Sequence, residues 1–188
     1  MADVPKIYVD ACPLIDMAKH KASRPLAESA EKNAEREQDV WYMKRLLAAS
    51  RDGVISVVSS FATIAECLSI RDKGEPRAIP DPNTQRFYSE LLTSAKSGLL
   101  VIYPTTSIME KVRDLWWRHE IFLKPMDAIH VATAMDRRCK EILTRDGDIY
   151  KNRERLAQLR LTVIYPSNTA LLPAAYAQDD FHEKLSET

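Results

Sequence analysis

Four acidic side chains stand where they could act together. Each follows a short apolar run or lies in a helix joined to one, and the four are Asp10, Glu66, Asp127 and Asp146. Carboxylates gathered in one place repel one another, and protonating them at pH 7 requires large pKa shifts. Mg²⁺ or Mn²⁺, which prefer hard oxygen ligands, would resolve this conflict. Such a site can activate a water molecule and offset phosphate charge during an in-line displacement.

Each acid also has an ordinary structural interpretation. Asp10 could form a turn or cap a helix, and Asp127 could stabilise a helix N-terminus. Asp146 and its neighbour Asp148 could be turn residues. Glu66 is harder to explain in this way, because apolar residues flank it on both sides and a lone buried carboxylate is costly. We therefore favour a shared site over four separate coincidences.

Short apolar runs separated by helical patterns indicate the elements that position these acids. The expected strands are Lys6–Val9, Val54–Val58, Leu99–Tyr103, Glu141–Thr144 and Leu161–Tyr165. Helices are expected from Pro13, over about 25–50, after the presumed caps Ser59 and Ser60, over about 84–97, from Thr105, from Pro125 and over 152–158. This alternation predicts an α/β fold with three layers, α/β/α, around a central parallel sheet of five strands. Ligands of such sheets gather beyond the carboxyl ends of the strands, which is where the acids are placed.

The chain is expected to form one domain. We assign residues 1–166 to it, with a helical and loop insertion around 71–98, where several prolines and Gly74 interrupt the pattern. Residues 167–188 are expected to be a C-terminal extension that is partly flexible.

Composition excludes several classes of protein. The chain has 188 residues, of which 27 are basic and 27 acidic, so its formal net charge is zero. Its 45% content of hydrophobic residues is too high for a disordered chain. Binding DNA mainly through bulk positive charge would need an excess of Lys and Arg that is absent here. A local basic groove remains compatible with this balance.

Cysteine spacing and hydropathy indicate the cellular compartment. Cys12, Cys67 and Cys139 are odd in number and far apart, which favours reduced thiols over a zinc site or a disulfide scaffold. The first residues do not follow the signal-peptide pattern. No stretch reaches the roughly 18 apolar residues that cross a bilayer. We expect a cytoplasmic protein with no membrane partner.

Four segments resemble the successive motifs of the PIN domain family. They are Ile7-Tyr8-Val9-Asp10-Ala11-Cys12, Glu66 on the predicted helix after the second strand, Lys124-Pro125-Met126-Asp127-Ala128-Ile129-His130-Val131-Ala132-Thr133-Ala134, and Leu143-Thr144-Arg145-Asp146. The third is the most specific, and the resemblance covers roughly residues 5–166. Cys12 departs from the Ser, Thr or Asn that is common at its position. The segments between the first three motifs are longer than in compact toxins of this type.

The resemblance implies a PIN-like Mg²⁺- or Mn²⁺-dependent endoribonuclease, as in the VapC-like toxins of bacterial toxin–antitoxin pairs. It assigns Asp10, Glu66, Asp127 and Asp146 to the metal site as catalytic acids, with Asp148 as the alternative to Asp146. Thr144 matches a supporting hydroxyl beside the fourth acid. The implied partners are an RNA substrate, an antitoxin protein and a second copy of the chain in a homodimer.

Other functional residues are less clearly indicated by the sequence. His130 could be a metal ligand or a general base, although a role in packing its helix on the sheet is favoured. Basic residues near the first and fourth motifs could hold phosphates: Lys19, Lys21, Arg24, Arg137, Arg138, Lys140, Arg145, Lys151, Arg153 and Arg155. Trp117 and Phe122 could stack on bases or form a dimer contact, whereas Trp116 is expected in the core.

A phosphatase and a non-catalytic binding module are the two rivals of the nuclease interpretation. A phosphatase of the haloacid type would carry a second Asp two residues after Asp10, where Cys12 stands, and the glycines are too scattered for a phosphate-binding loop. The alternative that remains is a non-catalytic PIN-like module that binds RNA or another protein. The presence of all four acids argues against this alternative.

Overall fold

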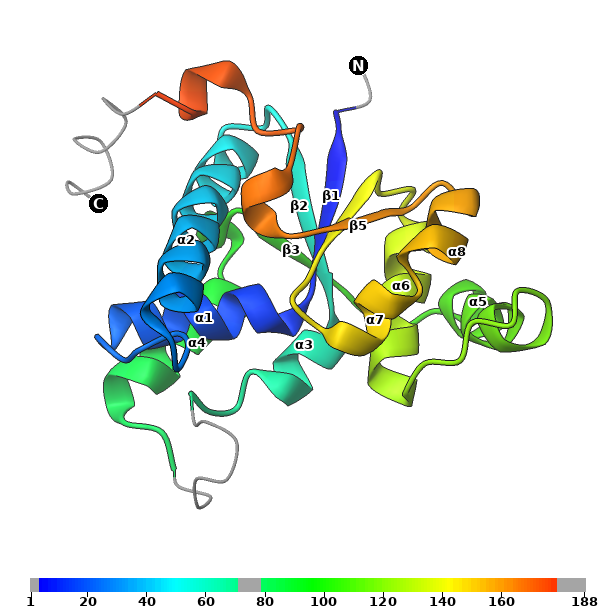
Figure 1. The fold of residues 1–188 in the computed structure, drawn as a ribbon, viewed down its shortest axis with the longest axis horizontal. Coiled ribbons are helices and arrows are strands. Elements are labelled where there is room, and N and C mark those ends of the chain that lie inside the picture. Colours follow the sequence, from blue (N-terminus) through cyan, green and yellow to red (C-terminus); the bar gives the residue numbers. More distant parts are fainter. Residues whose placement is uncertain (1–3, 71–78, 179–188) are drawn as a thin grey trace.

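Five strands form one parallel sheet at the centre of the molecule (Figure 1). The computed structural model describes residues 4–70 and 79–178. The strands are β1 (Lys6–Val9), β2 (Ser56–Ser60), β3 (Leu99–Ile102), β4 (Glu141–Leu143) and β5 (Thr162–Ile164). Their order across the sheet is β3-β2-β1-β4-β5, and every neighbouring pair is parallel. The predicted α/β fold with a five-stranded parallel sheet is confirmed.

Helices cover both faces of this sheet (Figure 1). On one side lie α1 (Ala11–Lys21), α2 (Ala30–Arg51) and α4 (Pro82–Thr93), and on the other lie α5 (Thr106–Trp117), α6 (Pro125–Asp136), α7 (Gly147–Lys151) and α8 (Arg153–Gln158). The short helix α3 (Phe61–Glu66) follows β2 directly. Single turns of 3₁₀ helix occupy Ala95–Ser97, Pro166–Asn168 and Ala174–Tyr176.

Side-chain alternation along β1 divides the core into two parts. Ile7 and Val9 pack with the helices on one face, whereas Tyr8 packs with those on the other, as the two-residue period of a strand requires. All three side chains are fully buried. A strand that is buried on both faces reads as a continuous apolar run, which is why β1 could be predicted from so few residues.

Several predicted boundaries are wrong, and local hydrogen bonds explain two of them. The long helix α2 begins at Ala30 rather than near residue 25, because Ser29 caps it by accepting from the Lys32 amide. Ser59 belongs to β2 instead of capping a helix, and its buried hydroxyl donates to the Val9 carbonyl oxygen at 2.7 Å. The expected turn after β4 contains the start of α7, with Asp146 as its cap.

The predictions for the other parts of the chain have mixed outcomes. Thr105 caps α5 as expected, but Trp116 is 55% exposed, so its predicted core position is wrong; Leu115 faces the core instead. Of the predicted insertion, residues 71–78 lie outside the described residues, as do residues 179–188 of the C-terminal extension. Within the described ranges, no helix combines the length and apolar character needed to span a bilayer.

Candidate active site

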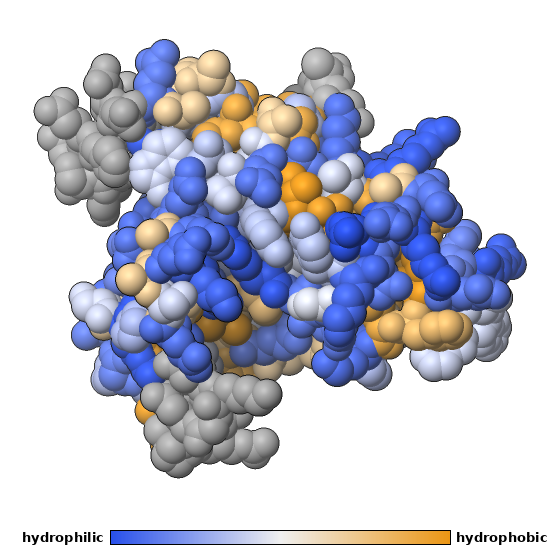
Figure 2. Space-filling model, viewed as in Figure 1, coloured by the Kyte–Doolittle hydropathy of each residue, from blue (hydrophilic) through white to orange (hydrophobic). Residues whose placement is uncertain are grey.

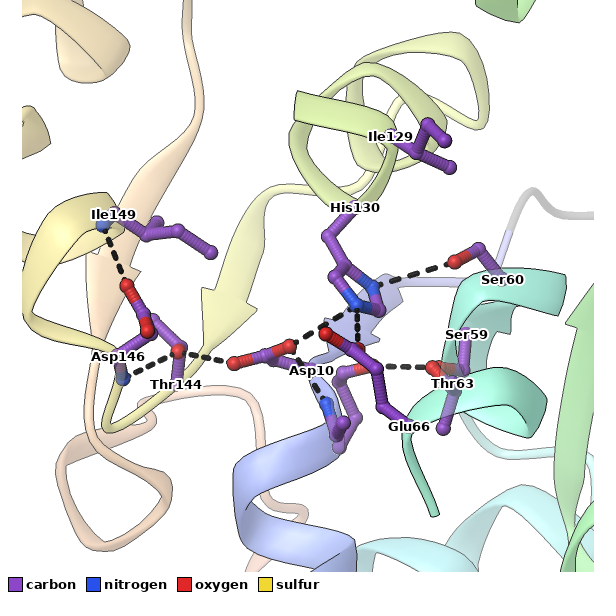
Figure 3. Close-up of polar contacts among 12 residues, drawn as sticks. Asp10, Ser59, Ser60, Thr63, Glu66, Ile129, His130, Thr144, Asp146 and Ile149 are labelled. Atoms are coloured by element: carbon purple, nitrogen blue, oxygen red, sulfur yellow. Dashed lines mark hydrogen bonds and ion pairs between the residues drawn. The ribbon is translucent and has the colours of Figure 1, made fainter. Parts of the chain in front are cut away.

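The sheet order brings the predicted acids toward one edge. Asp10 directly follows the central strand β1, and β1 has β2 and β4 as its two neighbours. Glu66 is the last residue of α3, which continues from β2, while Asp146 comes three residues after β4. Asp127 lies in the first turn of α6. Because parallel strands end at the same edge, residues far apart in the sequence meet there (Figure 3).

Asp10 is held by two hydrogen bonds. The backbone N–H of Ala11 donates to its Oδ1 at 2.7 Å, which makes Asp10 the cap of α1. The Thr144 hydroxyl donates to its Oδ2 at 2.6 Å and in turn accepts from the Asp146 backbone N–H at 2.8 Å. Thr144 therefore connects the first acid to the fourth (Figure 3), consistent with the supporting role that the sequence suggested.

Asp146 and Asp148 have different surroundings. The Oδ1 of Asp146 accepts from the backbone N–H groups of Asp148 and Ile149 at 2.7 and 3.0 Å. The carboxylate of Asp148 instead lies 2.7 Å from Lys124 Nζ and 3.3 Å from Lys151 Nζ. These two lysines lower the pKa of Asp148. The charge of Asp148 is therefore balanced mainly by these two lysines, whereas the Asp146 carboxylate accepts its hydrogen bonds from backbone amides.

Asp127 carries the clearest sign of an unbalanced charge. Its side chain is buried, and its Oδ2 has no hydrogen-bond partner among the described residues. Burial raises the pKa of Asp127 to about 6, and the negative charges of Asp146 and Asp10 act in the same direction. A buried carboxylate oxygen without a donor is unfavourable in a folded protein unless something else binds there.

His130 lies between Glu66 and Asp10 and contacts both carboxylates. Its Nε2 lies 2.6 Å from Glu66 Oε2 and 3.3 Å from Asp10 Oδ1 (Figure 3). Its Nδ1 lies 2.7 Å from the Tyr8 hydroxyl. Burial opposes protonation of the ring, but the hydrogen bond to Glu66 and the charge of Asp10 leave the pKa of His130 raised.

The sequence interpretation of His130 was incomplete. The expected packing role agrees with its complete burial on α6, but its polar contacts were not foreseen. The available signal was its spacing of three residues from Asp127, which places both side chains on one side of the helix. Tyr8, two residues before Asp10 on the strand, gave no signal of its own.

The donor atoms suit a hard divalent cation. Asp10, Glu66 and His130 offer ligand atoms within 4.8 Å of one another, and so do Asp127, Asp146 and Asp148. Most of these atoms are carboxylate oxygens, the ligands that Mg²⁺ and Mn²⁺ prefer. The unpaired oxygen of Asp127 is an independent reason to place a cation beside Asp127 and Asp146. The residues present therefore fit such an ion.

Other residues named from the sequence have defined positions near this edge. Arg145 is not directed to a phosphate site; it forms ion pairs with Asp39 at 2.6 Å and with Glu35 at 3.4 Å. Its guanidinium also stacks on the Tyr165 ring, 4.1 Å from the centroid. Burial and the charge of Asp10 raise the pKa of the Cys12 thiol, so this thiol stays protonated beside the acids.

Comparison with known proteins gives a family. A family model described as PIN domain matches residues 7–155, a range that includes all four acids, Thr144 and His130. No curated protein and no solved structure matches the chain.

Proposed function

This chain belongs to the PIN domain family, and from that membership we propose that it is an endoribonuclease that hydrolyses RNA phosphodiester bonds with Mg²⁺ or Mn²⁺. Nuclease chemistry is the general activity of the family. The observation that carries the proposal is the buried, unpaired Asp127 oxygen, together with a pKa raised to about 6 beside Asp146 and Asp10. A cation would relieve this repulsion.

The proposed cation ligands are Asp10, Asp127, Asp146 and Glu66. We choose Asp146 over Asp148 because two lysines already neutralise Asp148. The negative charges that raise the pKa of Asp127 also come from Asp146, Asp10 and Glu66. When bound, the cation polarises a phosphate oxygen and makes water a better nucleophile.

The protein's own groups have separate tasks in this proposal. The Thr144 hydroxyl donates a hydrogen bond to Asp10 and accepts one from the Asp146 backbone N–H. It therefore fixes the positions of the first and fourth acids relative to each other. The helix N-terminal amides after Asp146 orient that carboxylate. Fixed carboxylates lose little freedom when they bind, which favours preorganised binding of the cation and substrate. Without a cation the same acids would repel the phosphates of RNA.

The test is cleavage of RNA by purified protein. We expect cleavage with Mn²⁺ or Mg²⁺ that EDTA abolishes, and loss of cleavage in Asp10→Asn and Asp127→Asn. Both variants keep the size of the side chain while removing its charge. If the wild type and both variants cleave equally, the activity comes from a contaminant and the assignment of the acids is wrong. If calorimetry detects no cation binding to the wild type, the non-catalytic module is the better interpretation.

The toxin role is a finer part of the same proposal, supported by the resemblance of the motifs to VapC-like toxins. It requires a partner antitoxin, and a small DNA-binding protein encoded immediately upstream would be the candidate. Expression of the wild type should then arrest bacterial growth, whereas Asp127→Asn should not. Co-expression of the upstream protein should restore growth, and growth arrest by both forms would contradict a nuclease toxin.

A further inference from the structure

We propose that His130 is a positioning residue of this site, and that Tyr8 and His130 form a buried hydrogen-bond relay that holds the Glu66 carboxylate against Asp10. This inference rests on the proposed nuclease function. It assigns to two residues of the core a role in preparing the cation site, beyond packing the sheet.

The geometry sets the direction of the relay. An ionised carboxylate only accepts hydrogen bonds, so the Nε2–H of His130 donates to Glu66 Oε2 across 2.6 Å. The Tyr8 hydroxyl lies 2.7 Å from the opposite ring nitrogen, Nδ1, to which it donates when the ring is neutral. Ser60 Oγ lies 3.3 Å from the same nitrogen. Figure 3 shows His130 descending from its helix between Ser60 on one side and Asp10 and Glu66 on the other.

Glu66 depends on this contact more than the other acids depend on a single partner. Asp10 and Asp146 each accept backbone N–H donors at the start of a helix, so their own elements fix them. Glu66 ends a helix of six residues, has one more rotatable bond than an aspartate, and its side chain is 30% exposed. In the described part of the chain, its carboxylate receives its hydrogen bond from His130.

The burial of His130 argues against simple packing. The ring is fully buried on α6, and the Tyr8 ring packs against it edge-on with the ring centroids 5.8 Å apart. An aliphatic side chain would fill this position without the cost of burying two polar nitrogens. Both nitrogens have partners here, and one of them is an acid of the site. The ring is therefore positioned by its polar partners, and of the two Glu66 carboxylate oxygens it contacts Oε2.

The experiment compares His130→Ala with His130→Gln, since the Gln side-chain amide can donate from nearly the place of Nε2. Calorimetry measures the Kd for Mn²⁺, RNA cleavage gives kcat and KM, and thermal melting checks the fold. We expect His130→Ala to weaken Mn²⁺ binding by about 10- to 100-fold, as for other residues that orient metal ligands. His130→Gln should recover most of that loss. Tyr8→Phe, which removes only the hydroxyl, should weaken binding in the same direction but less.

A double-mutant cycle separates positioning from a general loss of structure. If His130 acts through Glu66, adding His130→Ala to Glu66→Gln should produce little further loss of Mn²⁺ affinity or cleavage. Additive losses, or equal damage from His130→Ala and His130→Gln, would overturn the relay while wild-type cation binding and cleavage leave the nuclease proposal standing. A wild type that neither binds Mn²⁺ nor cleaves RNA would overturn the nuclease proposal and the relay with it.

Discussion

The acids of the site differ in what balances their charge. Asp10 and Asp146 accept backbone amides, Glu66 has His130, and Asp148 has two lysines. Asp127 has a buried oxygen with no such donor among the described residues. The charge repulsion in the metal-free cluster therefore falls mainly on Asp127. Removing the charge of a single acid should raise stability and lower activity.

Asp127→Asn should stabilise the metal-free protein. The folded-state pKa of about 6 lies above the ordinary value of 3.8, so the folded protein takes up a proton first as the pH falls. Wild-type stability should thus rise as the pH falls from above 6 toward 4, and the Asn variant should lack this contribution. At pH 7.5 with EDTA we expect its melting temperature to be about 2–4 °C higher, the equivalent of about 1 kcal/mol. Calorimetric melting at pH 7.5 and 5 checks this; a lower melting temperature of the variant at pH 7.5 would contradict it.

Asp146→Asn and Asp148→Asn form a matched pair two residues apart. Asn also caps helices well, so α7 should persist in Asp146→Asn, and Asp148→Asn leaves the Asp146 cap in place. Asp148 forms ion pairs with two lysines, whereas the charge of Asp146 acts on Asp127. We therefore expect Asp146→Asn to abolish cleavage and Asp148→Asn to reduce cleavage less than about 3-fold. Single-turnover RNA cleavage at saturating Mn²⁺ measures both. The reverse ranking would assign the metal to Asp148.

At the scale of elements, the site depends on ties between segments far apart in the chain. Asp39 on α2 is 2% exposed at its side chain and pairs with Arg145, just before the Asp146 cap. Its other oxygen accepts the Ser167 backbone N–H at 2.9 Å, after β5. Asp39 on α2 therefore binds both the segment that follows β4 and the segment that follows β5.

Asp39→Asn should be destabilising because it leaves the half-buried Arg145 without its main partner. Removing one member of a buried pair costs about 3 kcal/mol. Glu35→Gln is the control, since Glu35 is exposed and lies 3.4 Å from the same arginine, and it should cost less than about 0.5 kcal/mol. Urea unfolding of the three proteins measures the difference in the free energy of unfolding. Equal costs for the two variants would show that burial does not strengthen the Asp39 pair.

At the scale of the whole molecule, the numbers of acidic and basic residues are equal, but the charges are distributed unevenly. Hydrophilic residues cover much of the face in Figure 2, with smaller hydrophobic areas between them. Several acids gather at one edge of the sheet, while Trp116, Trp117 and Phe122 are exposed near the end of α5. A bound cation would reduce the negative charge at that edge, where the substrate's phosphates must approach.

Mn²⁺ should stabilise the whole fold, because it binds the folded acids and not the separated acids of the unfolded chain. At a free concentration 100 times its Kd, the gain is about 2.7 kcal/mol, which raises the melting temperature by about 5–10 °C. EDTA should reverse the shift, and Asp10→Asn should abolish it. Thermal melting over a Mn²⁺ titration provides the measurement. An equal shift in Asp10→Asn would place the cation elsewhere.

Much of the fold could be predicted from local patterns. The buried strands appear as continuous apolar runs, and caps such as Thr105 depend on the few residues that follow them. The expectation of a parallel sheet with acids at its edge needs only this local information and the rule that ligands lie beyond the strand ends. Boundaries were less predictable: Ser59 has the residue type of a cap, but the neighbouring strand supplies a partner that keeps it in β2.

The local sequence determined which residues are acids, which segments become strands and which family the motifs resemble, because these depend on near neighbours. Tertiary structure decided which groups balance each acid. Tyr8 and His130 meet although they lie 122 residues apart, and Arg145 turns to Asp39 instead of to solvent. Such contacts depend on the order of strands in the sheet and on how the helices pack across it. Burial then turns these placements into pKa differences, since the same carboxylate is costly without a partner and stable beside one.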